Sequence, residues 1–206
     1  SCRGDGTAQG GSVSESFDIA IVGSGPGGLS AAARAAELKV SHVLLEATEQ
    51  VSYTIFRYQK GKHVMAEPEA LPLRSPLAFK AGSRESILDA WNEGVKALGV
   101  NVRYRAEVSK IKRGEDGFEL SIPGQAPIKA KNVVLGIGLQ GNIRKLDVPG
   151  GDAPFVQYQL DDPDEYEGET IIVIGAGDAA IENAVSLAKK NTVIVVNRRE
   201  EFARAK

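Results

Sequence analysis

Cysteine, methionine, tryptophan and histidine are almost absent from this sequence of 206 residues, which has one Cys, one Met, one Trp and two His. With Cys2 as the single cysteine, the chain excludes an internal disulfide and a CxxC redox pair. The two histidines, His42 and His63, lack metal-ligand spacing and any recognisable nucleophile beside them. We therefore predict no metal site, and the catalytic side chain stays unknown at this level.

Long apolar runs and an excess of basic residues are also missing. No apolar segment approaches the roughly 20 residues that a membrane helix needs, and no signal peptide is visible. The 25 Lys and Arg residues are balanced by 27 Asp and Glu, so a nucleic-acid surface is not expected. The sequence thus predicts a cytoplasmic protein with neither membrane nor nucleic-acid partners.

Folding is expected to begin at Phe17, because residues 1–16 are rich in Gly and Ser and hold almost nothing apolar. These residues are predicted to be a disordered linker. Residues 17–22 (FDIAIV) are typical of a strand buried on both faces of a parallel sheet. An alanine-rich helix over 28–38 follows, and a second strand over 42–45 leads to Glu46.

The turn after the first strand reads Gly23-Ser24-Gly25-Pro26-Gly27-Gly28 and matches GxGxxG. Its place between a buried strand and a helix is the context of a dinucleotide-binding turn. Gly23 permits the tight turn, Gly25 has no Cβ to keep a pyrophosphate away, and Gly28 lets helix and strand pack closely. The helix N-terminus would present its N–H groups to the phosphates. Glu46 is predicted to accept hydrogen bonds from both ribose hydroxyls.

The middle of the chain predicts one helix and several strands. Residues 84–98 carry an apolar helical stripe, with Ser83 placed to cap it. Three β-rich runs follow at 101–105, 107–113 and 117–122, with a hairpin signal at 114–117 (GEDG). Residues 132–135 (NVVL) read as another buried strand.

The opening pattern returns near the end of the sequence. Residues 170–174 and 192–196 are predicted strands around a helix over 178–190, and the turn reads Gly175-Ala176-Gly177-Asp178-Ala179-Ala180, a GxGxxA variant. Asn197-Arg198-Arg199 stands where an acid would follow the second strand. Arg198 and Arg199 favour NADP over NAD, because guanidinium groups pair with a 2′-phosphate. The alternative is two solvated arginines at a strand end.

Four stretches carry a family resemblance: DIAIVGSGPGGLSAA, VVLGIGLQGNIRKLDVPG, TIIVIGAGDAAIENAVSLA and VNRREEFARAK. The chain resembles the N-terminal portion of the flavoprotein reductases with two dinucleotide-binding domains. Within them it looks like the thioredoxin-reductase-like group, and most like the ferredoxin–NADP reductase kind that lacks CxxC.

The resemblance implies an α/β fold with two domains. Residues 17–138 would form a Rossmann-like FAD-binding domain of a parallel sheet plus a β-meander. Residues 139–206 would begin a second Rossmann-like domain, incomplete here, that binds NAD(P). FAD is expected in the first domain and NADP(H) in the second, where Asp178 and Ala180 belong to the site. Gly136 and Gly138 are expected near the flavin, and the backbone of Val108 is expected to meet the adenine.

Three departures from the family pattern qualify the resemblance. Tyr158-Gln159-Leu160-Asp161 stands where thioredoxin reductases have CxxC, so reduction of thioredoxin through that dithiol is excluded. Asn197 replaces a histidine, and a further arginine is displaced to Arg204. The family continues for roughly a hundred more residues, so we expect a longer protein.

The sequence therefore favours an FAD-dependent NAD(P)H oxidoreductase, because it shows cofactor sites and leaves the reactivity to the cofactor. Its partner would be an electron acceptor, such as ferredoxin or a small disulfide. A homodimer and additional domains before or after the chain stay open. Two alternatives remain: a nucleotide-binding or regulatory module without turnover, and, ranked lower, an FAD monooxygenase.

Overall fold

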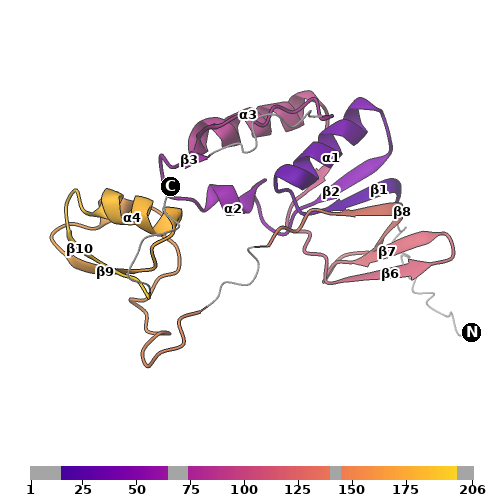
Figure 1. Cartoon of the computed structure of the whole chain (residues 1–206). Coiled ribbons are helices and arrows are strands. Elements are labelled where there is room, and N and C mark those ends of the chain that lie inside the picture. Colours follow the sequence, from indigo (N-terminus) through magenta and orange to yellow (C-terminus); the bar gives the residue numbers. More distant parts are fainter. Residues whose placement is uncertain (1–14, 65–73, 140–144, 199–206) are drawn as a thin grey trace, which may run out of the picture. The chain divides into compact units, whose positions relative to one another are not determined.

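The computed structural model describes residues 15–64, 74–139 and 145–198. The chain divides into two compact units, whose elements are labelled in Figure 1. The first unit comprises Ser1–Tyr53, Pro68–Phe79 and Ala90–Leu139, and the second comprises Thr54–Glu67, Lys80–Asp89 and Gln140–Lys206. Most of the predicted linker, together with Arg199 and Arg204, lies outside the described residues.

A six-stranded sheet forms the first unit, in the order β5-β2-β1-β8-β7-β6. Its strands are β1 (Ser16–Val22), β2 (His42–Leu45), β5 (Val102–Arg103), β6 (Lys110–Gly114), β7 (Gly117–Ser121) and β8 (Ile128–Leu135). The strands β5, β2, β1 and β8 are parallel, whereas β8, β7 and β6 form an antiparallel meander. The predicted α/β fold class, a parallel sheet plus a β-meander, is confirmed.

Three strand predictions differ from the structure in extent. The run 107–113 forms a strand only from Lys110, where pairing with β7 begins. The run 101–105 pairs only through Val102 and Arg103, because Arg105 adopts a φ of +53° and leaves the extended region.

Strand β8 is longer than the predicted 132–135, because it starts at Ile128, where it pairs with Leu120 of the meander. Cross-strand pairing of this kind adds residues that a purely apolar run does not mark. The prediction that 132–135 is buried is wrong: Asn132, Val134 and Leu135 are exposed.

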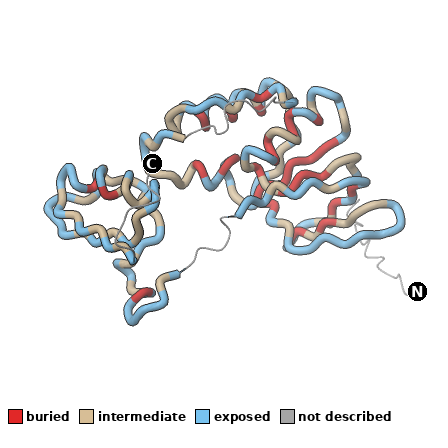
Figure 2. The backbone as a smooth tube through the Cα atoms, viewed as in Figure 1, coloured by how far each residue is buried: buried red, intermediate tan, exposed pale blue. Residues whose placement is uncertain are grey.

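Helix α1 (Pro26–Glu37) packs against β1, β2 and β8. It begins two residues before the predicted start, with Pro26 in the first turn, where its fixed φ suits a helix. Leu29, Ala32 and Ala33 on its inner face are fully buried. The opposite face of the sheet buries Ala20, Val43 and residues of the meander. All four residues of β2 and the last three of β1 are buried, as the red stretches of the tube in Figure 2 show.

Helix α3 (Arg84–Ala97) confirms the helix predicted over 84–98. Its stripe of Ile87, Leu88, Trp91 and Val95 is buried. Ser83 Oγ accepts a hydrogen bond from the N–H of Ser86 at 3.2 Å, which is the predicted cap.

The second unit contains a parallel pair, β9 (Thr170–Ile174) and β10 (Thr192–Val196), joined by α4 (Asp178–Leu187). It also contains α2 (Tyr53–Phe56), which starts at the unit boundary, β3 (His63–Val64), β4 (Gly82–Ser83) and the 3-10 turn η1 (Pro163–Glu165). Helix α4 ends three residues before the predicted Lys190, because the Asn191 side-chain amide donates to the carbonyl of Leu187 at 3.0 Å and closes the last turn.

Residues 57–62, from the first third of the chain, contact α4 and the segment just before η1. The N–H of Lys60 donates to the Asp161 carbonyl at 3.0 Å. Lys62 pairs with Glu182 of α4 at 2.8 Å, and Gln59 donates to Ser186 at 2.9 Å. These contacts are why the second compact unit includes residues far upstream of β9. The boundary at 138/139 stays a prediction.

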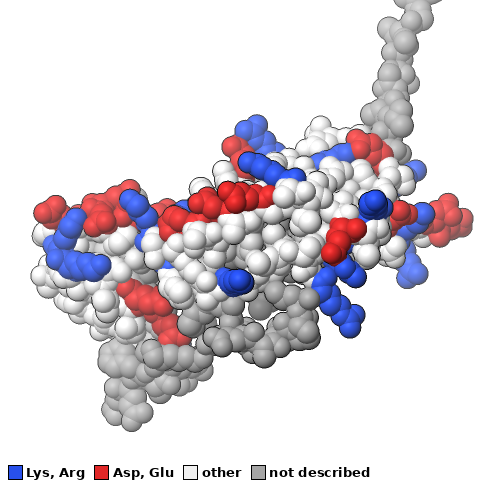
Figure 3. Space-filling model, turned by 90° about the horizontal axis from the view of Figure 1, so that it is seen from above, with Lys and Arg blue, Asp and Glu red and all other residues white. Residues whose placement is uncertain are grey.

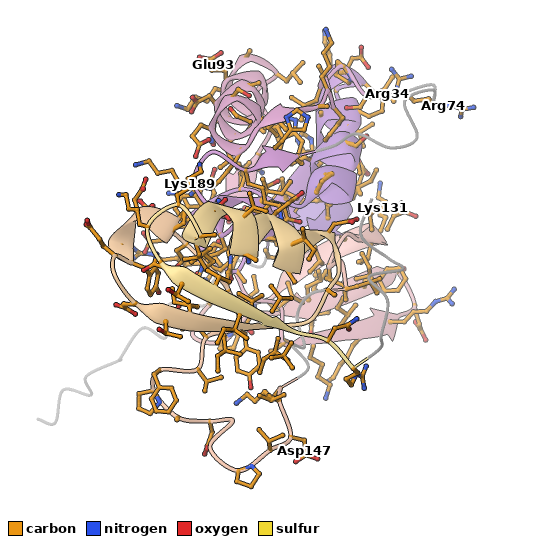
Figure 4. The ribbon with its side chains drawn as sticks, turned by 60° about the vertical axis from the view of Figure 1, so that its left-hand side comes forward. Arg34, Arg74, Glu93, Lys131, Asp147 and Lys189 are labelled. Atoms are coloured by element: carbon orange, nitrogen blue, oxygen red, sulfur yellow. The ribbon has the colours of Figure 1, made fainter. Side chains whose placement is uncertain are left out.

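Charged side chains of both signs share the molecular surface, as the face in Figure 3 shows. Lys131 of β8, labelled in Figure 4, lies 2.7 Å from Asp18 of β1. Solvent screens exposed pairs of this kind, so each contributes little to stability. None of the helices among the described residues is long and apolar enough to span a membrane.

Candidate functional site

The glycine turn between β1 and α1 is held between the ends of two neighbouring strands. The N–H of Gly23 donates to Leu45 at the end of β2, at 2.8 Å. The N–H of Gly136, just after β8, donates to Val22 at 2.7 Å. Gly23 has a φ of +92°, and a Cβ there would lie 2.6 Å from the carbonyl oxygen of Gly136. Only glycine fits this position. The hydrogen bonds to the strand ends place the turn at the carboxyl edge of the sheet, where the motif predicts it.

Gly28 and Gly136 bring three backbone segments into direct contact. A Cβ at Gly28 would lie 1.8 Å from the carbonyl oxygen of Gly23. A Cβ at Gly136 would lie 3.0 Å from both the Cα and the N of Gly28. The structure therefore brings the predicted Gly136 to the first glycine turn, although more than a hundred residues of sequence separate them.

The N-terminus of α1 opens at this edge. Gly25 is the N-cap residue, and no side chain caps the helix. A Cβ at Gly25 would be 3.8 Å from its nearest neighbour, and one at Gly27 would meet nothing within 4 Å. Helix N–H groups without a side-chain cap, beside Cα atoms without side chains, form a ready anion site. Pro26 supports the site because it removes no needed donor at this helix position.

Ser24 and Glu46 lie together beneath the turn. Both are buried, and the hydroxyl and the N–H of Ser24 donate to one carboxylate oxygen of Glu46. Ser24 Oγ also accepts the N–H of Ser52 at 3.0 Å. The hydroxyl and the N–H of Ser24 are therefore both bonded within the protein, and its contact with a cofactor stays a prediction.

The sequence analysis does not predict two further polar residues of this site, Thr48 and Ser52. Thr48 donates to the second carboxylate oxygen of Glu46, and Ser52 Oγ donates to the Ser24 carbonyl at 3.0 Å. Ser52 is buried with a φ of +53°, a conformation that costs free energy outside glycine. The only signal in the sequence was a hydroxyl residue two positions after Glu46, which is too common to single out.

Val108 and Gly138, both predicted to contact the cofactor, differ in burial. Val108 packs, partly buried, against the core cluster of the first unit. The N–H of Ala106, two residues before it, donates to the Glu46 carbonyl at 2.8 Å. Gly138 has a φ of +64° and nothing within 4 Å of its Cβ position.

The pKa of the Tyr104 phenol is raised by partial burial and by the charge of the Glu46 carboxylate.

The second glycine turn repeats the first in a looser form. The N–H of Gly175 donates to Val196 at the end of β10, at 2.9 Å. Gly175 has a φ of +122°, and its Cβ position lies 3.8 Å from the Cβ of Ala180. That spacing leaves room for the alanine in GxGxxA. Gly177 is the N-cap of α4, with no side-chain cap and nothing within 4 Å of its Cβ position.

The ends of this second site are exposed. Asp178 is the first residue of α4 and is exposed. Arg198 is exposed two residues beyond β10, at the sheet edge that also carries the glycine turn. Arg199 lies outside the described residues, so the predicted pair of arginines is placed only in part.

A hollow of about 360 Å³ in the second unit was not foreseen from the sequence. Its lining includes Arg57, Tyr158, Asp161 and Tyr166, so the segment that stands in place of CxxC contributes to it. The Tyr158 hydroxyl accepts from the N–H of Leu146 at 2.8 Å and donates to a backbone carbonyl at 3.0 Å. Tyr158 thereby holds the loop before it.

Comparison with known proteins finds one family profile and several reductases that resemble this chain. A family profile described as pyridine nucleotide-disulphide oxidoreductase matches residues 20–206. A ferredoxin–NADP reductase of Ignicoccus hospitalis is 31% identical over 186 residues, covering 90% of this chain and 57% of that protein. A thioredoxin reductase of Peptoclostridium acidaminophilum is 27% identical, covering 92% of this chain and 57% of that protein.

Among solved structures, the bacillithiol disulfide reductase of Staphylococcus aureus has a TM-score of 0.81 at 23% identity. The match covers 93% of this chain and 60% of that one, and it shows a shared fold. The chain thus spans a little over half the length of the curated relatives it matches.

Proposed function

Because this chain belongs to the pyridine nucleotide-disulphide oxidoreductase family, we propose that it is the FAD- and NADP(H)-binding part of a flavoprotein reductase. The observation that carries the proposal is the glycine edge of the first unit. Gly23 and Gly28 pack there against backbone that would collide with a Cβ, beside the N-terminus of α1. At that N-terminus no side chain caps the helix, and Gly25 and Gly27 leave the space around it open. An open helix N-terminus that presents N–H groups fits a pyrophosphate.

The residues around this edge fit the rest of FAD. Glu46 lies at the end of β2, where a carboxylate can accept hydrogen bonds from ribose hydroxyls. Leu135, Ile137 and Leu139, which alternate with Gly136 and Gly138, are 62%, 67% and 97% exposed. Exposed apolar side chains beside a backbone-lined edge suit the flat apolar ring system of a flavin.

The second glycine turn would hold the pyrophosphate of the nicotinamide cofactor at the N-terminus of α4. Arg198 and Arg199 follow β10 and would pair with a 2′-phosphate, so NADP(H) is the proposed cofactor. With both groups bound, the chemistry supplied is hydride transfer from the nicotinamide to the flavin and onward electron transfer to an acceptor. The chain's own residues bind and orient the two groups.

The acceptor is proposed to be ferredoxin or a small disulfide. This chain has Tyr158-Gln159-Leu160-Asp161 in place of a CxxC, and its one cysteine cannot form a dithiol. Electrons would therefore pass to the acceptor without a protein dithiol from these residues.

The colour of the purified chain and its response to NADPH test the proposal. We expect a yellow protein that NADPH bleaches under anaerobic conditions. A colourless chain that binds NADPH would instead support a nucleotide-binding module without turnover. A flavin that NADPH bleaches, and that oxygen reoxidises rapidly only with an organic substrate, would support a monooxygenase.

A further inference from the structure

The Glu46 carboxylate has a full set of hydrogen-bond donors within the protein itself. Its Oε2 accepts the Ser24 N–H at 3.2 Å and the Ser24 hydroxyl. Its Oε1 accepts the N–H and the hydroxyl of Thr48, both at 2.9 Å. A carboxylate offers about four acceptor sites. Ribose hydroxyls can therefore reach Glu46 only where one of these donors gives way.

The four donors differ in how easily they can leave. The two N–H groups are held by the backbone. Both hydroxyl oxygens also accept a backbone N–H, that of Ser52 on Ser24 at 3.0 Å and that of Gln50 on Thr48 at 3.3 Å. The Thr48 hydroxyl has two acceptors for its one proton: Glu46 Oε1 at 2.9 Å and the Gln50 carbonyl at 3.0 Å. Thr48 can thus release the carboxylate and keep a hydrogen bond.

We propose that Thr48 is a positioning residue for the cofactor ribose, an inference that rests on the proposed binding of FAD at this site. Its hydroxyl donates to Glu46 Oε1 and so occupies one acceptor site of the carboxylate. When a ribose hydroxyl donates to Glu46, the Thr48 proton turns to the Gln50 carbonyl. The buried carboxylate consequently keeps its donors in both states, which avoids the cost of burying an unsatisfied charge.

This exchange predicts that Thr48→Val raises the affinity for FAD, although the substitution removes a hydrogen bond to Glu46. Hydrogen bonds to a charged acceptor are stronger than those to a neutral carbonyl, so the exchange opposes binding slightly. Valine removes the competing hydroxyl. We expect the variant to bind FAD about two- to tenfold more tightly by flavin-fluorescence titration, while its cofactor-free form melts at a lower temperature.

Support of Glu46 by Thr48 alone, without exchange, predicts weaker binding, so unchanged or weaker FAD affinity in Thr48→Val overturns the proposal. Thr48→Ser retains the hydroxyl and should match the wild-type chain in affinity. Thr48→Ala should change affinity in the same direction as valine and replaces it where valine impairs folding. Thr54→Val, at an exposed threonine away from Glu46, controls for the loss of a hydroxyl in general.

A comparison of two probes assigns the effect to the ribose hydroxyls. Thr48→Val should tighten the binding of ADP and leave that of 2′,3′-dideoxy-ADP unchanged, because the analogue has no hydroxyl for Glu46. Equal tightening of both would overturn the exchange. A wild-type chain that binds neither FAD nor ADP would overturn the proposed function itself. A wild-type chain that binds both, with no gain in Thr48→Val, would overturn only the role of Thr48.

Discussion

At the scale of single residues, the first glycine turn depends as much on missing side chains as on present ones. A Cβ at Gly23 or Gly28 would collide with backbone, and one at Gly136 would lie 3.0 Å from the backbone of Gly28. The neighbouring Gly25 and Gly27 have room for a methyl group. The glycines therefore divide into those needed for packing and those that leave space at the helix N-terminus.

This division predicts opposite outcomes for two alanine substitutions in α1. Gly28→Ala would place a Cβ 1.8 Å from the Gly23 carbonyl oxygen and should lower the free energy of unfolding by about 1–3 kcal/mol. Gly27→Ala is the matched control, which should be neutral or stabilise by up to about 1 kcal/mol, because alanine favours a helix. Urea unfolding followed by circular dichroism measures both. Equal stability of the two variants would contradict the packing role of Gly28.

The proposed preference for NADP(H) can be tested at two side chains. Arg198→Ala combined with Arg199→Ala should weaken NADPH binding by about 1.5–3 kcal/mol, because a charge-assisted contact with the 2′-phosphate is lost. NADH binding should hardly change. Calorimetric titration with both nucleotides gives the ratio, and Arg113→Ala, an exposed arginine on β6, serves as the control. Equal losses for NADPH and NADH would refute the phosphate role.

At the scale of elements, strand pairing places the two parts of the first site. Strand β8 lies parallel to β1 with Leu135 beside Val22, so Gly136 follows directly at the turn. The sequence predicted both strands, yet their adjacency comes from sheet pairing, which no local pattern specifies. The register is supported at the surface by the pair of Lys131 with Asp18.

That ion pair should appear in the titration of Asp18. The hydrogen bond and the charge of Lys131 hold the pKa of Asp18 below its ordinary value of 3.8, and Asp18 in turn raises the pKa of Lys131. The stabilisation by the carboxylate is complete above its ordinary pKa and is lost as the pH falls through the lowered value. Lys131→Gln should return the Asp18 pKa toward its ordinary value in an NMR titration. Lys129→Gln, at another exposed position of β8, should leave it unchanged, and an unshifted pKa in both variants would exclude the pair.

At the scale of the whole molecule, the two units differ in how far other residues cover their strands. In the first, all four residues of β2 and the last three of β1 are buried. In the second, Ile172, Ile174, Ile194 and Val196 are 47–59% exposed on one face of β9 and β10. Neighbouring exposed apolar side chains of this kind mark a surface that favours contact with other apolar groups.

The exposed face of β9 and β10 should bind a hydrophobic dye. Ile172 and Ile194 are register partners, so Ile172→Thr with Ile194→Thr should reduce the fluorescence of bound ANS, while threonine keeps strand propensity. Val185→Thr removes an exposed apolar side chain from α4 and should reduce the signal less. Equal dye binding by the double variant and the unsubstituted chain would show that this face is not the binding surface.

The organisation into units depends on features that the sequence predicts and on others that it does not. The glycine turn and the apolar strands predict the segments around β9. The attachment of residues 57–62 to α4 was not, because it depends on pairs such as Lys62 with Glu182. Long-range polar contacts between surface side chains leave no periodicity in either segment.

Sequence alone determined the strand–turn–helix units and the positions of their glycines, because steric freedom and helix propensity act between neighbouring residues. Tertiary structure decided which distant residues complete the site. Gly136 reaches the first turn through sheet pairing, Ser52 bonds to Ser24, and Thr48 bonds to Glu46. The contacts of Gly136 and of Ser52 join groups that lie far apart in the sequence, so they exist only once the chain has folded and excluded water from them.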